Sequence, residues 1–423
     1  LSAMGDVAMS APVVGALRKC YPEAQIVIMT PSFLQPFFRG IERIEFISPD
    51  FKGRHKGFRG LLRLSAELGK FDMVADLHDV IRTKMLRKVF CLRGAKVVHI
   101  DKGREETKVL VDFENQHLVQ FQTTIERYRE VFLKLGFDIP PIAPPQRVKY
   151  AMSPETAQLA GAHDGKWIGI GPFAQHQGKI YPLDHMEQVI AKLSTYENVR
   201  LFIFGGGPVE REYSERMEQT YPRVTSVIGR IKLGQEMELV SNLDLMVSMD
   251  SSSMHMASLV GVPAVSIWGA THPYAGFYGL GQDPRHAVQL DMACRPCSIY
   301  GNKPCVYGDY PCMKNIDPEL VVKKVCEVYY VRLFRCIFDY CKTLCLYCRQ
   351  HHVYGSADRH NVKVNSVAQK RLGSCVDHRV FLHGHLGTES LKALYMLVNG
   401  ANSEIAAAGH CNLGLGKSAE KGA

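Results

Sequence analysis

The sequence is dominated by a regular alternation of short, β-rich apolar runs with helical stretches, which limits the chain to a small set of α/β folds. In the first block this pattern predicts strands at Ile26–Thr30, Arg43–Ile47, Met73–Leu77 and Ala95–Ile100, and helices at Phe58–Leu68, Ile81–Phe90 and His117–Leu135. A second block predicts strands at Trp167–Ile170, Val199–Phe204, Val224–Ile228, Leu243–Met249 and Ala264–Trp268. Two such blocks indicate two doubly wound, Rossmann-like units facing each other across a cleft.

Prolines mark the boundary between the two blocks. Pro140, Pro141, Pro144 and Pro145 can continue neither a helix nor a central strand, so they predict a loop near a domain boundary. We therefore expect one domain over residues 1–155 and a second over residues 156–330. The alternation then stops. Residues 331–423 read as a tail richer in Cys and His, either a small extra domain or sequence without a fixed structure.

The first unit is expected to lack its opening strand. Residues 1–7 read as the loop that follows a strand, and they lead into a helix that runs through Pro12 to Lys19. A central parallel strand, buried on both faces, would have to precede Leu1. We therefore expect the first domain to be truncated at its start.

The charge of the 423-residue chain is +9, but six of the nine excess positive charges lie in residues 331–423. The rest is too mildly basic to indicate a nucleic-acid partner, and it suits anionic small molecules or weak contact with an anionic membrane surface. No run of about 20 uncharged apolar residues predicts a membrane-spanning helix. With no secretory signal in view, a cytoplasmic protein with reduced thiols is expected.

Three loops that follow predicted strands of the second unit carry residues suited to phosphate binding. Backbone N–H groups and a helix N-terminus attract anions, and the carboxyl ends of parallel strands open on one crevice. Each loop alone could be an ordinary tight turn or a helix cap, but together they predict a nucleotide site. The candidate residues are Gly206 and Gly207 in the first loop, Asp250, Ser251, Ser252 and His255 in the second, and Gly269 and Thr271 in the third.

Two charged residues outside these loops are candidates for catalysis. Lys179 follows the strand Trp167–Ile170, where an ammonium group could neutralise a diphosphate; the alternative is a solvated surface lysine. Asp6 stands beyond Gly5, at the carboxyl end of the expected opening strand. Its carboxylate could accept a proton from an attacking hydroxyl, or it could simply cap a helix.

Four cysteines form a cluster with the spacing C-x2-C-x7-C-x6-C. Four thiolates this close in sequence could hold a structural zinc ion. Two disulfides or four free thiols are the alternatives. The residues are Cys294, Cys297, Cys305 and Cys312.

In combination, these segments resemble the ADP-heptose:lipopolysaccharide heptosyltransferases of glycosyltransferase family 9. The resemblance runs from residue 1 to about residue 328, and the order of the pieces is more specific than any one of them. The matching residues are Leu1–Val7 with Pro12, Ala75–Asp79 with Arg82, Lys179 with Pro182, Gly205–Pro208 with Glu210, Asp250–Ser252 with His255, and Gly269–Pro273.

The resemblance implies a GT-B fold, with an N-terminal acceptor domain and a C-terminal sugar-nucleotide domain. It implies inverting transfer of heptose from ADP-heptose to a hydroxyl of the lipopolysaccharide inner core, with Asp6 as general base and Lys179 stabilising the departing diphosphate. The loop residues would hold the donor, and Glu210 would contact its ribose. Arg82 would bind an anionic group of a Kdo-lipid A acceptor. No cofactor is required, and the lipid acceptor implies peripheral contact with the cytoplasmic face of the inner membrane.

Other functions are compatible with the same residues. One is a different GT-B activity, using another sugar nucleotide or acting as a sugar-nucleotide epimerase. Another is a catalytically inert protein that binds a sugar nucleotide. An epimerase needs no separate acceptor, so turnover of a UDP-sugar without an acceptor would distinguish it.

Overall fold

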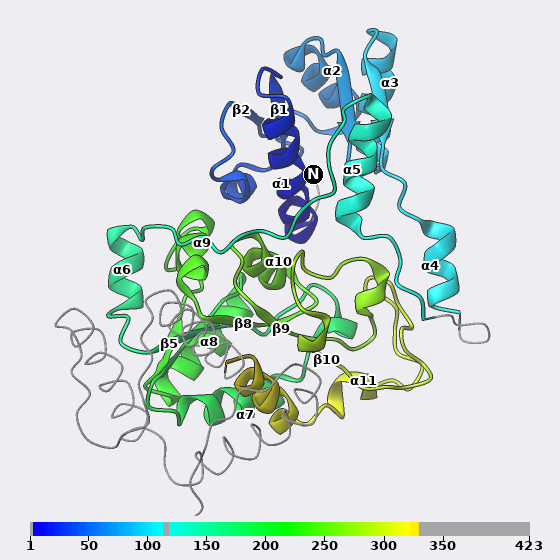
Figure 1. Cartoon of the computed structure of the whole chain (residues 1–423). Helices are drawn as coiled ribbons and strands as arrows, with labels where there is room; N and C mark the ends of the chain where they lie inside the picture. The colour runs from blue at the N-terminus through cyan, green and yellow to red at the C-terminus, as the bar shows by residue number, and fades with distance from the viewer. Residues whose placement is uncertain (1–2, 113–117, 330–423) are drawn as a thin grey trace, which may run out of the picture. The chain divides into compact units, whose positions relative to one another are not determined.

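The computed structural model describes residues 3–112 and 118–329, which hold every element discussed below (Figure 1). The predicted tail, residues 331–423, lies outside the described residues. The alternation of strands and helices predicted from the sequence is confirmed in both blocks, and the bounds of the predicted strands agree to within a few residues. The fold class is therefore α/β, with every strand pair parallel.

The second unit is built on a six-stranded parallel sheet in the order β10-β9-β8-β5-β6-β7. Its strands are β5 (Lys166–Gly171), β6 (Val199–Ile203), β7 (Val224–Ser226), β8 (Leu245–Met249), β9 (Ala264–Ile267) and β10 (Ala287–Val288). β5 lies at the centre, where Ile168 is in register with Leu201 of β6 and Leu245 of β8. β5 and β8 are almost entirely buried apolar runs, as is expected of strands that are covered on both faces of a sheet.

Helices cover both faces of this sheet, which makes the unit doubly wound. Ile168 and Ile170 of β5 pack in one core cluster with residues of α7 (Leu183–Ser194) and α8 (Pro208–Thr220). Trp167 points the other way, into a cluster with residues of α9 (Leu233–Asn242) and α10 (Ser252–Leu259). Because successive side chains of a strand point to opposite faces of the sheet, β5 contributes side chains to both core clusters.

The first unit contains two separate parallel pairs of strands. β1 (Ile26–Met29) pairs with β2 (Ile44–Ile47), and β3 (Met73–Asp76) pairs with β4 (Lys96–His99). A groove of about 760 Å³ lies between the pairs and is lined by all of β1 and β3. A strand leading into the first helix would fit between these two edges, at the position expected for an opening strand.

The helices of this unit are α1 (Met4–Cys20), α2 (Gly57–Leu68), α3 (Ile81–Leu92), α4 (Arg104–Leu110) and α5 (Thr124–Leu135). α1 starts well before Pro12, so the segment predicted as a loop is already helical at Met4. The helix predicted over His117–Leu135 is confirmed from Thr124 to Leu135, but its predicted start is wrong. α5 begins at Thr124, because the Thr123 side chain accepts a hydrogen bond from the Glu126 N–H and caps the helix there.

Several short elements were not predicted. They are α4, α6 (Pro154–Ala160), α11 (Pro311–Lys314), the strand β10, and the 3-10 turns η1 (Ser32–Phe38), η2 (Gln177–Lys179), η3 (Pro273–Ala275) and η4 (Pro284–His286). The proline cluster lies in an irregular segment between α5 and α6, as expected from its sequence. No helix among the described residues is long and apolar enough to cross a membrane.

Candidate active site

An ion pair lies at the carboxyl ends of the central strands of the second unit. Lys179 ends the turn η2, and Asp250 directly follows β8. The Lys179 Nζ atom is 2.8 Å from Oδ2 of Asp250, and the side chains are only 14% and 3% exposed. Lys179 is therefore a nearly buried, paired cation and not the solvated surface lysine that the sequence left open.

Asp6 lies within electrostatic range of this pair, although it belongs to the first unit. It stands in the first turn of α1, whose N-cap residue is Ala3, so Asp6 is not the helix N-cap. Burial raises the pKa of its carboxyl above the ordinary value, while Lys102, a hydrogen bond from the Ala3 backbone and Lys179 act in the opposite direction. The pKa of Asp6 is therefore set by two opposing effects, burial and the positive charge of two lysines, as is common for groups in functional sites.

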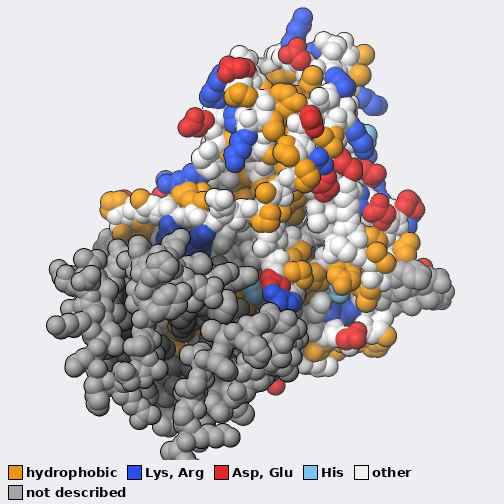
Figure 2. Space-filling view, in the orientation of Figure 1, with side chains coloured by type: hydrophobic (Ala, Val, Ile, Leu, Met, Phe, Trp, Pro, Cys, Tyr) orange, Lys and Arg blue, Asp and Glu red, His pale blue; other side chains and the backbone are white. Residues whose placement is uncertain are grey.

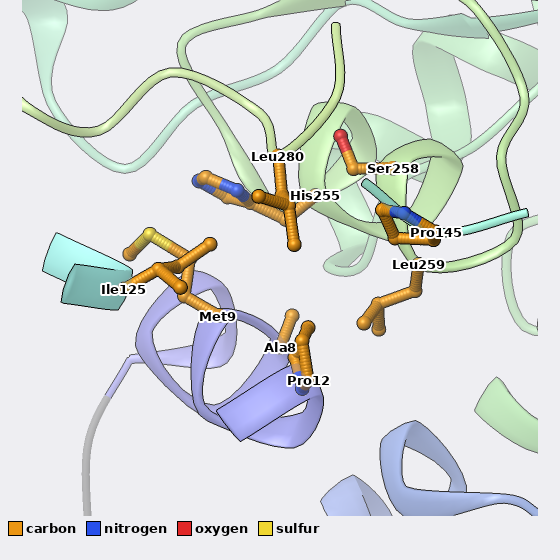
Figure 3. Close-up of a pocket in the computed structure, with 9 residues that line it drawn as sticks. All are labelled: Ala8, Met9, Pro12, Ile125, Pro145, His255, Ser258, Leu259 and Leu280. Atoms are coloured by element: carbon orange, nitrogen blue, oxygen red, sulfur yellow. The ribbon is translucent and has the colours of Figure 1, made fainter. Parts of the chain in front are cut away.

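His255 brings α10 against the start of α1. It is buried, and a Cβ atom added to Gly5 would lie only 3.1 Å from the His255 ring. A cavity of about 10 Å³, room for one water molecule, separates the helices there, with Ala8, Met9 and Pro12 on the α1 side (Figure 3). Burial lowers the pKa of His255 to about 4, so its imidazole is neutral near pH 7.

The serines before α10 surround its N-terminus. Ser251 is the N-cap residue, and its side chain makes no capping hydrogen bond to the helix. Its Oγ atom lies 3.2 Å from Oγ of Ser248. Ser252 is the first helical residue. The helix N-terminus therefore keeps backbone N–H groups with no side-chain cap, next to the Lys179–Asp250 pair.

The glycine loop after β6 is held by Glu210. The Gly206 backbone N–H donates to Oε2 of Glu210 at 2.6 Å, across the first turn of α8. No atom lies within 4 Å of where a Cβ would stand on Gly206 or Gly207. The loop is thus open on the side of these two glycines. In this structure the Glu210 carboxylate accepts the hydrogen bond of the loop's Gly206 N–H.

The third loop is fixed by Arg295, which the sequence did not single out. The buried Arg295 guanidinium donates to the backbone carbonyls of Gly269 and Thr271. The Thr271 hydroxyl is itself buried and makes no hydrogen bond within the described part of the chain. The Ala270 carbonyl accepts from the Cys297 and Ser298 N–H groups, so the cysteine segment also supports this loop.

The structure gives the zinc hypothesis no support. Among residues 3–112 and 118–329, no three His, Cys, Asp or Glu side chains gather as metal ligands. Burial raises the pKa of the Cys312 thiol to about 11 in the metal-free chain. Cys294, Cys297, Cys305 and Cys312 are all free, which also excludes the two disulfides in this structure.

Arg82 lies on the exposed side of α3, where its guanidinium stacks over the Phe51 ring, 4.7 Å from the centroid. The neighbouring acidic segment is held by Arg87, which the sequence missed. Arg87 pairs with Asp76 at 3.4 Å and with Asp79 at 3.0 Å. These carboxylates are therefore held in a structural network of ion pairs, whereas Arg82 is exposed.

Lys102 was also missed, and it lies near the start of α1, as does His78 of the matching segment Ala75–Asp79. Lys102 lowers the pKa of Asp6 and of His78 electrostatically. Burial is the main cause that lowers the pKa of His78 to about 4. A lone lysine in a loop and a histidine after a strand carry no sequence signal for this. Only the fold brings them to the site.

Two solved structures of glycosyltransferases share this fold. The chain superimposes on a family 9 glycosyltransferase from Veillonella parvula with a TM-score of 0.60 at 20% identity, covering 77% of this chain and 94% of the other. It superimposes on the E. coli ADP-heptose lps heptosyltransferase II with a TM-score of 0.55 at 18% identity, covering 78% and 97%. The fold is therefore the GT-B fold of this class of enzymes.

Sequence comparison identifies the family within that class. The profile of glycosyltransferase family 9 (heptosyltransferase) matches residues 61–304, more than half of the chain. Lipooligosaccharide heptosyltransferase 2 of Campylobacter jejuni is 22% identical over 327 residues, covering 76% of this chain and 95% of the relative. Its counterpart in Haemophilus influenzae is 25% identical over 289 residues, covering 64% and 82%. The chain belongs to glycosyltransferase family 9, the heptosyltransferases.

Proposed function

We propose that this enzyme transfers heptose from ADP-heptose to a hydroxyl of the lipopolysaccharide inner core, with inversion at the anomeric carbon. The observation that carries the proposal is the approach of Asp6, from the first unit, to the Lys179–Asp250 pair of the second. A transferase needs a base on the acceptor side and a cation on the leaving-group side. The names of the similar heptosyltransferases support the donor and the acceptor class.

Asp6 is the general base of the proposed reaction. Its carboxylate takes the proton of the acceptor hydroxyl while that oxygen forms a bond to the anomeric carbon. The bond between the anomeric carbon and the diphosphate oxygen breaks on the opposite face, and ADP leaves with the electron pair. Attack from the opposite face inverts the configuration. Lys102 helps to keep Asp6 in the ionised form that can accept the proton.

The second unit binds the donor in this proposal. Lys179 lies at the diphosphate and stabilises the charge that develops as ADP leaves, a role that needs no metal ion. Ser251, Ser252 and the N-terminus of α10 hold phosphate or sugar oxygens. Asp250 and His255 orient Lys179 and the sugar, and Glu210 releases the Gly206 N–H to contact the ribose.

The remaining loops complete the donor and acceptor sites. Gly206 and Gly207 allow the donor to approach the backbone, because no atom lies within 4 Å of an added Cβ there. In the third loop the space beside Gly269 is filled by Met313, so that loop contributes through Thr271, whose hydroxyl has no hydrogen-bond partner among the described residues and bonds the donor. Arg82 binds an anionic group of the acceptor, such as a Kdo carboxylate or a lipid A phosphate. Its outward guanidinium, stacked on Phe51, is pre-oriented for a planar anion.

The test is calorimetric titration with ADP, UDP and GDP, followed by transfer from the matching sugar nucleotide to a deacylated Kdo acceptor in the presence of EDTA. We expect preference for ADP, transfer that survives EDTA, and an inverted anomeric centre by NMR. Asp6→Ala should keep ADP binding and lose transfer. Turnover of a UDP-sugar without acceptor would favour an epimerase, and ADP binding with no transfer by the unaltered chain would favour an inert binder.

A further inference from the structure

A cationic and apolar surface lies on α2 and the loop before it, away from the residues proposed for chemistry. Residues 51–66 contain five Lys or Arg and no Asp or Glu. Phe58 and Leu62 stand one helical turn apart on the outer side of α2 and are 60% and 41% exposed. Arg59 and Arg63 are exposed beside them at the same spacing. We call Phe58, Arg59, Leu62 and Arg63 the α2 face.

The cationic loop is held firmly against this helix. The Asp50 carboxylate accepts hydrogen bonds from the backbone N–H groups of Lys52, Gly53 and Arg54, and the Asp50 N–H donates to Nδ1 of His55. The buried His55 contacts Glu67 of α2 at 3.0 Å. The lysines of the loop are therefore presented next to the α2 face on a fixed backbone.

Most of the positive charge on this surface is not neutralised. Arg54 pairs with Glu67 at 2.6 Å. Within the described part of the chain, Lys52, Lys56, Arg59 and Arg63 make no ion pair with an acidic side chain. α3 packs beside α2 and adds the exposed Lys88, together with Ile81, which is 78% exposed. Lys84 of α3 is also exposed, and its Nζ atom lies 3.8 Å from Oδ1 of Asp79. Figure 2 shows Lys, Arg and hydrophobic side chains intermixed over the region that Figure 1 assigns to these helices.

We propose that the α2 face, with the adjoining loop and the outer side of α3, docks on an anionic lipid bilayer. A small anion would need the cations alone. Exposed Phe and Leu side chains one turn apart, flanked by arginines, instead match an amphipathic helix that lies in the membrane interface. Clusters of four to eight Lys or Arg on such a helix bind anionic headgroups, at about 1 kcal/mol for each cation near the surface.

This inference rests on the proposed function, because a lipid-anchored acceptor places the reaction at a membrane surface. The apolar side chains would enter the interface, and the cations would lie at the headgroup level. Because α3 begins at Ile81 and Arg82, the same surface would hold the proposed acceptor residue close to the bilayer. Docking would thus reduce the search for the acceptor hydroxyl from three dimensions to two.

The experiment is co-sedimentation of the full chain with vesicles of phosphatidylcholine containing phosphatidylglycerol, without donor or acceptor. We expect binding at low ionic strength, little binding to pure phosphatidylcholine, and release at about 1 M salt, where screening acts over only about 3 Å. Arg59→Gln/Arg63→Gln should weaken binding by about 30-fold, the factor for two cations at about 1 kcal/mol each. Phe58→Ser/Leu62→Ser should weaken it by more than tenfold.

Matched controls replace similar exposed residues elsewhere. Lys149→Gln/Lys303→Gln removes two exposed cations, and Val306→Ser/Tyr307→Ser removes two exposed apolar side chains; both should bind vesicles like the unaltered chain. All variants should keep the melting temperature and the transfer rate with deacylated acceptor. Equal vesicle binding by the α2-face variants and the controls would overturn the proposal, as would equal binding to neutral vesicles. Since vesicle binding needs no transfer, failure of the proposed function would show separately.

Discussion

The Nζ atom of Lys179 and Oδ2 of Asp250 lie 2.8 Å apart, and both side chains are nearly buried. Each charge is therefore removed from water and depends on the other for compensation. In the proposed reaction this pair also faces the diphosphate of the donor. Lys179 would then be shared between a permanent partner and a charge that grows during transfer, and Asp250 would limit how far the lysine can move.

The first prediction separates the structural from the catalytic part of this pair. Lys179→Gln and Asp250→Asn should each destabilise the fold by about 3 kcal/mol, because each leaves the other charge buried and unpaired. The double variant should lose less than the sum of the two. Chemical denaturation of all four proteins measures the coupling free energy. Additive losses would contradict a buried ion pair.

Transfer should respond differently from stability in the same variants. Lys179→Gln should lower kcat by about 100-fold or more, since the stabilising cation is gone. Restoring the stability with the second substitution should not restore the rate. Lys192→Gln, which removes the half-exposed partner of Glu319, serves as the control and should leave both quantities unchanged. A double variant with recovered kcat would exclude a catalytic role for Lys179.

The second prediction concerns the base. Asp6→Asn should lower kcat by about 10²–10⁴-fold while ADP affinity stays the same. Burial raises the pKa of Asp6 above its ordinary value of 3.8, and the active form is the carboxylate. Activity should therefore fall as the pH drops through that raised pKa. The acidic limb should disappear from the residual activity of Asp6→Asn.

The effect of Lys102 on the acidic limb of the pH–rate profile can be tested by substitution. Its ammonium group lowers the pKa of Asp6, so Lys102→Gln should raise that pKa and move the acidic limb of the pH–rate profile to higher pH. Lys108→Gln is the matched control, since Lys108 is exposed and paired with Glu105. An unmoved limb in Lys102→Gln, or a limb moved to lower pH, would mean that another group titrates.

The sequence predicts the strands of all three sheets well, apart from the two-residue β10, because their apolar runs are continuous and bounded by turn residues. It fails at the start of α5. The capping hydrogen bond of Thr123 makes the helix begin at Thr124, although the helical sequence pattern extends further towards the N-terminus. At the site, loops after strands could be placed by topology alone. Lys102 and Arg295 could not, because each acts through a partner far away in sequence, and Arg87 could not, because it stands in no recognisable spacing to its partners Asp76 and Asp79.

The third prediction uses the buried histidine. In the folded chain the pKa of His255 is about 4, against about 6.5 when unfolded, so the unfolded chain binds the additional proton between these values. Stability is therefore complete above about pH 6.5 and falls as the pH drops towards 4. The contribution of this residue is about 1.4 kcal/mol per pH unit within that window. Denaturation curves at several pH values measure it.

His255→Gln should flatten this pH dependence by about one proton. His99→Gln removes an exposed histidine and controls for the substitution itself. A slope that is unchanged in His255→Gln would mean that the ring is already protonated in the folded chain. The remaining slope should come from other groups, among them His78 and His272, whose pKa values burial also lowers to about 4.

The fourth prediction compares two glycines of the proposed donor site. A Cβ on Gly178 would lie 2.8 Å from Ala270 Cβ and from the Gly301 carbonyl, so Gly178→Ala should cost about 1–3 kcal/mol and displace the Lys179 turn. A Cβ on Gly206 would meet no atom within 4 Å. Gly206→Ala should therefore keep full stability and raise KM for the donor. Unchanged KM in Gly206→Ala would remove that loop from the donor site.

The fifth prediction concerns the groove between β1 and β3. These strands each have a pairing partner on one side among the described residues, whereas β5 is paired on both sides. Backbone amides of β1 and β3 should therefore exchange with solvent at least about tenfold faster than those of β5, because local opening costs less there. Hydrogen exchange followed by mass spectrometry resolves the segments. Uniform protection would contradict the open groove.

An added strand that fills the groove should reduce the difference in amide exchange rate between β1 or β3 and β5. Five Val or Ile residues fused directly before Leu1 could lie parallel to both edges and bury apolar side chains on both faces of the sheet. Exchange in β1 and β3 should then slow towards that of β5, and the melting temperature should rise. A Gly/Ser fusion of equal length is the control. If both fusions behave alike, the 760 Å³ groove does not accept a strand, and the two pairs of strands are complete as they stand.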